Sequence, residues 1–216
     1  MNKRSFIKSL GLLAATGPIL SLNFPKENSN KTLLPKALLL GQTVGIISPS
    51  AATADRMEFT YAKEAMEALG LKVKLGKNFE NRFGHLAGTD EERAEDFNAM
   101  FADPEVNAII CLRGGSGAAR ILPLIDYEQV KANPKPLLGY SDITAFHCAL
   151  QSQAGLISFH GPNGSGSWNS FNAGQFQQLF FEQKLLTFKN EIGKGDDLVA
   201  KGNRIQTLTA GSVEGK

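Results

Sequence analysis

The stretch PLLGYSDITAFHCALQ (residues 136–151) combines a short apolar strand, a sharp turn and the start of a helix. Its apolar run stops at Gly139, and apolar residues at helical spacing begin again after Ser141. A serine at such a junction either caps the helix by accepting a backbone N–H or acts as a nucleophile on a tight turn. The residues G-Y-S-D-I lack the second glycine of the G-x-S-x-G hydrolase motif, so both roles stay open.

The rest of the chain alternates strand and helix patterns around this stretch. Apolar runs predict strands at 42–47, 71–75, 106–112, 136–140 and 156–159, and helical periodicity predicts helices at 53–70, 89–103, 126–133, 142–155 and 173–186. Within the first helix, five residues are predicted to share one face: Met57, Tyr61, Ala65, Ala68 and Leu69. Continuous apolar strands that alternate with helices predict an α/β fold, with a Rossmann-like parallel sheet flanked by helices.

Polar loops follow four of the predicted strands. They are SPSA (48–51), RGGSG (113–117), YSD (140–142) and HGPNG (160–164). Functional loops of parallel sheets gather at the carboxyl ends of the strands. The sequence therefore predicts a site at this edge of the sheet.

The loop RGGSG contains adjacent glycines, Gly114 and Gly115, which allow backbone N–H groups to approach an anion closely. The alternative is a merely tight turn. Neither G-x-x-x-x-G-K-[ST] nor G-x-G-x-x-G is present, which argues against a nucleotide-binding protein.

A nucleophilic serine also needs a base, and the chain has three histidines. His85 lies in a long loop, and His147 is about 240° round the helix from Ser141, so it points away. His160 ends a strand and is the candidate by position, with a loop-bracing role as the alternative.

Composition excludes several classes of protein. A net charge of +2 without a basic cluster gives no support for nucleic-acid binding. Cys111 and Cys148 lie in apolar patterns without the spacing of a metal or redox site. Residues 1–24 combine basic residues with a short apolar run, which is typical of an export signal, and residues 25–41 are predicted to be a polar linker. An amphipathic N-terminal helix is the alternative. No integral membrane segment is expected apart from the signal.

Three longer stretches together resemble the LD-carboxypeptidase family of serine peptidases, which contains muramoyltetrapeptide carboxypeptidases and microcin-immunity peptidases. They are LAGTDEERAEDFNAMFADPEVNAIICLRGGSGAARILPLIDY, KANPKPLLGYSDITAFHCAL and FHGPNG. The resemblance implies that Ser141 is the nucleophile and that the N–H groups of Gly115 and Asp142 form an oxyanion hole. It makes Gly114, Ser116 and His160 candidates for the substrate pocket.

The resemblance also implies a division into domains. Residues 42–165 correspond to the family's N-terminal α/β domain, which carries the nucleophile, and residues 166–216 form a helix and a connector. The family's C-terminal domain, with its catalytic Glu and His, is largely absent from this sequence. His160 belongs to the family's HGP loop and is not assigned as the base. The family usually has an aromatic residue at the position of Ser116, so the pocket wall is expected to differ.

The activity implied for the complete enzyme is removal of the terminal D-amino acid from L,D-linked muropeptides, in peptidoglycan turnover or recycling. The resemblance also implies that no metal or organic cofactor is needed. The fragment alone is expected to be inactive. The alternatives are an immunity peptidase acting on a peptide-nucleotide antibiotic and a non-catalytic muropeptide-binding module. The expected partner is a muropeptide, with a homodimer left open. The signal predicts export to the periplasm, whereas cytoplasmic recycling is the alternative.

Overall fold

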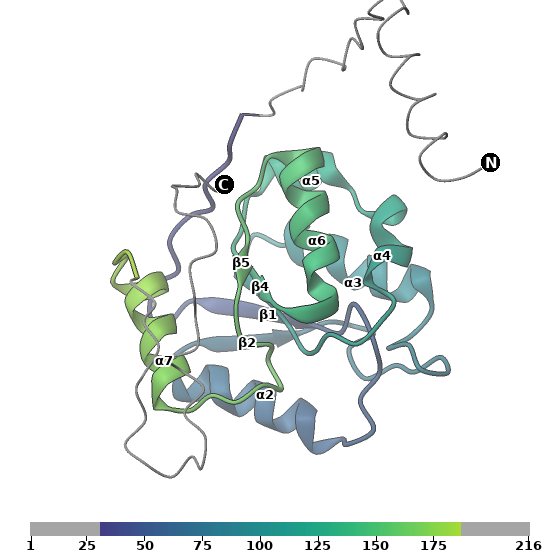
Figure 1. The fold of residues 1–216 in the computed structure, drawn as a ribbon, viewed down its shortest axis with the longest axis horizontal. Coiled ribbons are helices and arrows are strands. Elements are labelled where there is room, and N and C mark those ends of the chain that lie inside the picture. The colour runs from purple at the N-terminus through teal and green to yellow at the C-terminus, as the bar shows by residue number, and fades with distance from the viewer. Residues whose placement is uncertain (1–30, 187–216) are drawn as a thin grey trace, which may run out of the picture.

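A computed structural model describes residues 31–186 of the chain. Five parallel strands form one sheet in the order β2-β1-β3-β4-β5 (Figure 1). The strands are β1 (Thr43–Ile47), β2 (Lys72–Leu75), β3 (Val106–Cys111), β4 (Leu137–Gly139) and β5 (Phe159–His160). The predicted parallel α/β fold is confirmed.

Helices cover both faces of the sheet, as Figure 1 shows. The α-helices are α2 (Met57–Ala68), α3 (Asp90–Ala102), α4 (Ala118–Ile121), α5 (Tyr127–Ala132), α6 (Thr144–Ala149) and α7 (Ser170–Phe176). Shorter 3-10 segments span Leu122–Leu124 and Ser141–Ile143, and π-helical turns extend α6 over Leu150–Ala154 and α7 over Gln177–Phe181.

The two faces have separate hydrophobic cores because side chains alternate along each strand. Leu137 of β4 packs in the core with α3, α5 and α6, whereas its neighbour Leu138 packs in the core with α2 and α7. Continuous apolar strands are what a sheet with both faces covered requires.

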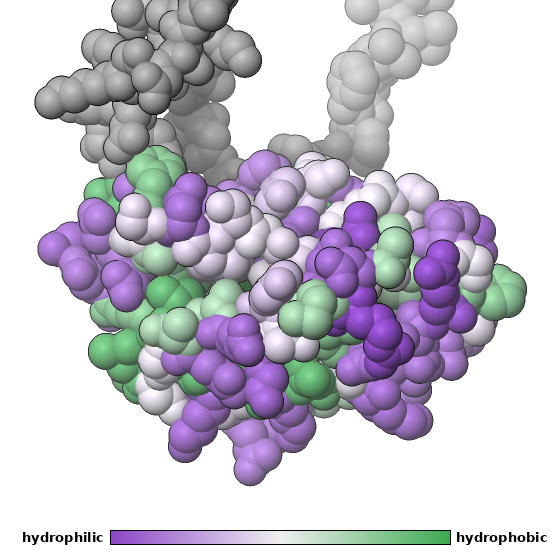
Figure 2. All heavy atoms as spheres, turned by 90° about the horizontal axis from the view of Figure 1, so that it is seen from below, coloured by the Kyte–Doolittle hydropathy of each residue, from purple (hydrophilic) through white to green (hydrophobic). Residues whose placement is uncertain are grey.

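The start of α3 follows local sequence signals. Thr89 caps the helix through the Glu92 N–H, and the Glu92 side chain accepts from the Thr89 N–H, which completes a capping box. This predicted helix start is confirmed. The predicted apolar face of α2 is only partly correct: Leu69 is buried, but Met57 and Tyr61 are exposed. Ala62 and Met66, which were not part of the predicted face, are fully buried. Figure 2, seen from below, where α2 lies in Figure 1, shows apolar side chains scattered among hydrophilic ones.

Several segment boundaries differ from the sequence prediction, and two of these differences have a clear physical reason. The second part of the predicted linker, residues 31–41, is attached to the domain: the Leu33 N–H donates to Gly155 O at 2.9 Å, and Leu38 is fully buried. Helix α7 begins at Ser170, three residues earlier than predicted, because the Asn169 side chain caps it. The export signal predicted for residues 1–24 and the connector beyond residue 186 lie outside the described residues. None of the helices within 31–186 is long and apolar enough to cross a lipid bilayer.

Candidate active site

Ser141 lies on the turn between β4 and α6 in a left-handed backbone conformation, with φ of +64°. L-residues pay about 1–2 kcal/mol for this conformation, and residues held in it cluster at functional sites. Ser141 is exposed. Neither the 3-10 segment that it begins nor α6 has a side-chain cap, so the capping role is not the one adopted. The turn presents the hydroxyl to solvent instead.

The RGGSG loop packs directly against this turn. A Cβ on Gly114 would lie 3.0 Å from the Ser141 Cβ and 3.2 Å from the Asp142 nitrogen. Gly115 has φ of +116°, and a Cβ there would lie 2.4 Å from the Ala51 Cβ. Space is tight around both glycines, and Gly115 also has a backbone conformation that favours glycine. The backbone of the loop therefore lies beside the serine turn.

The carboxylate of Asp142 connects three of the strand-end loops. It accepts a hydrogen bond from the Ser50 hydroxyl, in the loop after β1. It also accepts the Ala118 N–H at 2.9 Å, at the end of the RGGSG loop. Because Asp142 follows Ser141 directly, this link fixes the position of the turn relative to both loops.

A buried arginine on α3 donates hydrogen bonds to two of the same loops. Arg93 of α3 is 1% exposed, and its Nη1 donates to Pro49 O at 2.8 Å and Gly117 O at 2.9 Å. Its guanidinium pairs with Asp90, while burial lowers the pKa of Arg93 from its usual value. Sequence reasoning missed Arg93, because an arginine in an acidic helix looks like an ordinary solvent-facing residue.

His147 is a structural residue. Its Nε2 lies 2.9 Å from Gly139 O and its Nδ1 lies 2.7 Å from the Ser158 hydroxyl. A carbonyl only accepts, so Nε2 carries the proton and Nδ1 accepts from Ser158. Burial lowers the pKa of His147. The prediction that it points away from Ser141 agrees with these contacts, which use both ring nitrogens.

His160 lies at the same sheet edge, where β5 pairs with β4 in register with Gly139. It is exposed, and its ring centroid is 6.2 Å from that of Tyr140 and 6.0 Å from that of His147. Ser116 is also exposed. His85 lies in the loop after β2, where its carbonyl accepts the Ala52 N–H. Within residues 31–186, no three His, Cys, Asp or Glu side chains are grouped so as to hold a metal ion.

The fold and this turn together define a class of protein. It is a parallel α/β domain that presents a serine on a strained strand-to-helix turn, beside a glycine loop at the carboxyl edge of the sheet. Residues 44–161, more than half of the chain, match the model of the LD-carboxypeptidase N-terminal domain. The chain belongs to the LD-carboxypeptidase family.

Individual relatives agree with this assignment. A probable murein peptide carboxypeptidase of Bacillus subtilis is 41% identical over 170 residues, which cover 76% of this chain and 53% of that protein. The microcin C7 self-immunity protein MccF of Escherichia coli is 35% identical over 132 residues, covering 60% of this chain and 38% of that protein. The structure of MccF with aspartyl sulfamoyl adenosine superposes with a TM-score of 0.70 at 27% identity, over 82% of this chain and 56% of that one. The chain spans about half the length of the curated relatives it matches.

Proposed function

We propose that this chain supplies the nucleophile domain of a serine carboxypeptidase that removes the terminal D-amino acid from L,D-linked muropeptides. The observation that carries the proposal is the left-handed Ser141 at φ +64°, packed against Gly114. The matched relative named as a probable murein peptide carboxypeptidase supports the substrate class.

In the proposed reaction, Ser141 Oγ attacks the carbonyl carbon of the scissile amide. A histidine takes the hydroxyl proton, and the carbonyl oxygen becomes an oxyanion held by the N–H groups of Gly115 and Asp142. The same histidine then protonates the departing D-amino acid nitrogen. Water hydrolyses the acyl-enzyme and regenerates Ser141. Within this sequence, the family resemblance assigns no residue to the histidine or to the Glu that orients it.

The 216-residue chain alone is therefore expected to show little or no turnover. A serine hydroxyl is a weak nucleophile without an adjacent base. The test uses a fusion of this chain to the part of the Bacillus subtilis relative beyond the matched region. This fusion is expected to release D-alanine from a tetrapeptide muropeptide, and a fusion that is folded but inactive would count against the proposal.

A second candidate is an immunity-type peptidase that hydrolyses a peptide-nucleotide antibiotic. The structural match to MccF with aspartyl sulfamoyl adenosine favours it. Assay of the same fusion against a muropeptide and an aspartyl nucleotide amide separates the two functions, since only the preferred substrate is turned over at low concentration. A muropeptide-binding module without catalysis predicts binding and no turnover of either.

Export is a separate proposal, based on the basic and apolar pattern of residues 1–24. Fractionation of cells that express the tagged chain is expected to place it in the periplasm. Recovery in the cytoplasm at full length would favour a role in recycling instead.

A further inference from the structure

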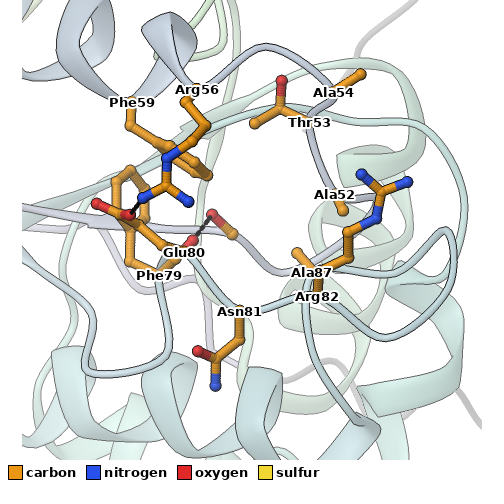
Figure 3. A pocket seen from close by; sticks show the side chains of 11 residues that line it. Ala52, Thr53, Ala54, Arg56, Phe59, Phe79, Glu80, Asn81, Arg82 and Ala87 are labelled. Carbon is orange, nitrogen blue, oxygen red and sulfur yellow. Dashed lines mark hydrogen bonds and ion pairs between the residues drawn. The ribbon is translucent and has the colours of Figure 1, made fainter.

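A cavity of about 220 Å³ lies between the loop after β1 and the loop after β2 (Figure 3). Its walls include Arg56, which precedes α2, and Phe59 of α2. They also include Phe79, Glu80 and Arg82 from the loop after β2. Because both loops follow carboxyl ends of strands, the cavity opens at the same sheet edge as Ser141. The cavity is large enough for one small ligand group, such as a short side chain that ends in a carboxylate.

The charges around this cavity leave one cation without an acidic partner. Arg56 pairs with Glu80. Arg82 donates from Nε to Gly84 O at 3.0 Å. Each of the other arginines within 31–186 has an acid partner: Arg93 and Arg120 pair with Asp90, and Arg113 pairs with Glu58. Arg82 is the one arginine of this part of the chain for which the structure records no ion pair, so the cavity has one net positive charge.

The arrangement of the side chains suits a ligand with one charged end. Figure 3 shows the Arg56 and Arg82 guanidinium groups on opposite sides of the cavity, whereas the Asn81 side chain points away. The Asn81 amide instead donates to Glu92 Oε1 at 3.0 Å. Phe59 lies edge-on to the buried Phe79, with ring centroids 5.0 Å apart, and supplies an apolar wall. Guanidinium groups bind carboxylates through paired hydrogen bonds.

The segment Ala51–Ala52 connects the cavity to the RGGSG loop beside Ser141. Ala52 lines the cavity, and its carbonyl accepts from Arg113 Nη1 at 3.4 Å. Its neighbour Ala51 donates its N–H to Gly114 O at 3.3 Å. A ligand in the cavity would therefore contact Ala52, the neighbour of the residue that is hydrogen-bonded to the RGGSG loop.

We propose that this cavity binds a free carboxylate of the peptide substrate, remote from the scissile bond, with Arg82 as its main anchor and Arg56 as a second. This inference rests on the proposed function, because it assumes a peptide with its amide at Ser141. The Glu80 carboxylate at the cavity disfavours a dianion such as phosphate. A monoanionic carboxylate fits the single net charge.

The experiment measures binding without turnover, so it is independent of whether Ser141 is catalytic. The ¹⁵N-labelled 216-residue chain is titrated with propionate as a carboxylate probe that has no amide bond, with propionamide as its uncharged counterpart, and with inorganic phosphate. The carboxylate probe is expected to shift the signals of Ala52, Arg82 and Ala87, the amide to leave them unchanged and phosphate to bind more weakly. Equal binding of the amide, or tighter binding of phosphate, overturns the proposal.

Three variants identify the anchor. Arg82→Gln is expected to weaken the binding of propionate about tenfold, because the variant loses a charge-assisted hydrogen bond to the carboxylate. Glu80→Gln is expected to tighten it, because Arg56 is released from its partner. Lys131→Gln removes the same charge from α5, where Lys131 pairs with Glu128, and is expected to change nothing. Unchanged affinity in Arg82→Gln, or no shift in the original chain, contradicts the inference. If the probe binds but Ser141 proves non-catalytic, only the proposed function fails.

Discussion

The hydroxyl of Ser50 donates a hydrogen bond to the carboxylate of Asp142, so the loop after β1 holds the residue that follows Ser141. Ser50 is fully buried. The Ala118 N–H donates to the same carboxylate oxygen. The strained turn is thus held by contacts from two loops that are distant in sequence.

This link predicts energetic coupling between Ser50 and Asp142. Ser50→Ala is expected to destabilise the domain by about 1–3 kcal/mol, the range for a buried hydrogen bond to a charged group. The double variant with Asp142→Asn is expected to cost less than the sum of the two single variants, by about 1 kcal/mol. Denaturant unfolding measures all four proteins. Ser48→Ala is the matched control, because buried Ser48 donates to the Phe79 carbonyl; its effect is expected to add to that of Asp142→Asn. Additive effects for Ser50 would refute the coupling.

The left-handed backbone of Ser141 predicts an unusual order of stability. Ser141→Gly is expected to be more stable than Ser141→Ala by about 1 kcal/mol, because only glycine adopts positive φ freely. Thr144, three residues on, has φ of −55° and is exposed. At this position the order of stability is expected to reverse, so that Thr144→Ala is more stable than Thr144→Gly by a similar amount. Thermal unfolding of the four variants provides the test, and the same order at both positions would argue against strain at Ser141.

The RGGSG loop is expected to tolerate no side chain at Gly115. Gly115→Ala adds a Cβ 2.4 Å from the Ala51 Cβ and is expected to cost about 2–4 kcal/mol through overpacking and backbone strain together. Gly84→Ala is the control: Gly84 also has positive φ, at +62°, but a Cβ there meets nothing within 4 Å. It is expected to cost about 1 kcal/mol from the backbone alone. Equal losses in unfolding free energy would show that Ala51 does not confine the loop.

Because His147 is buried, we expect the domain to become less stable as the pH falls. Burial lowers its pKa below the usual 6.5, so the unfolded chain binds the proton first as the pH falls. Stability from neutral His147 is therefore complete above about pH 6.5 and decreases below it, down to the folded-state pKa. His147→Gln is expected to flatten this part of the unfolding profile. His160→Gln, which changes the exposed neighbouring ring, serves as the comparison. An unchanged slope in His147→Gln would contradict the assignment.

Much of this architecture could be predicted because its causes are local. The spacing of apolar residues and the length of the apolar runs predicted the helices and strands of the α/β fold. The sequence that forms the capping box at Thr89 predicted the start of α3. Parallel topology then placed Ser141 and the RGGSG loop at one edge without any knowledge of their contacts.

Other features could not be predicted, because distant residues determine them. The positive φ of Ser141 depends on packing against Gly114. The burial of Arg93 depends on carbonyls from two other loops. Leu38 looks like part of a linker until the chain folds back and buries it. None of these contacts leaves a pattern in the local sequence.

D-Alanine release from a tetrapeptide muropeptide tests most directly the proposal that Ser141 is the nucleophile of a carboxypeptidase. The fusion with the Bacillus subtilis relative is assayed with Ser141 and with Ser141→Ala, beside the 216-residue chain alone. The fusion is expected to release D-alanine, the Ser141→Ala fusion to lose about 10³-fold or more of that rate, and the chain alone to release almost none. Full activity in the Ser141→Ala fusion, or Ser141-dependent release by the chain alone, would contradict the account.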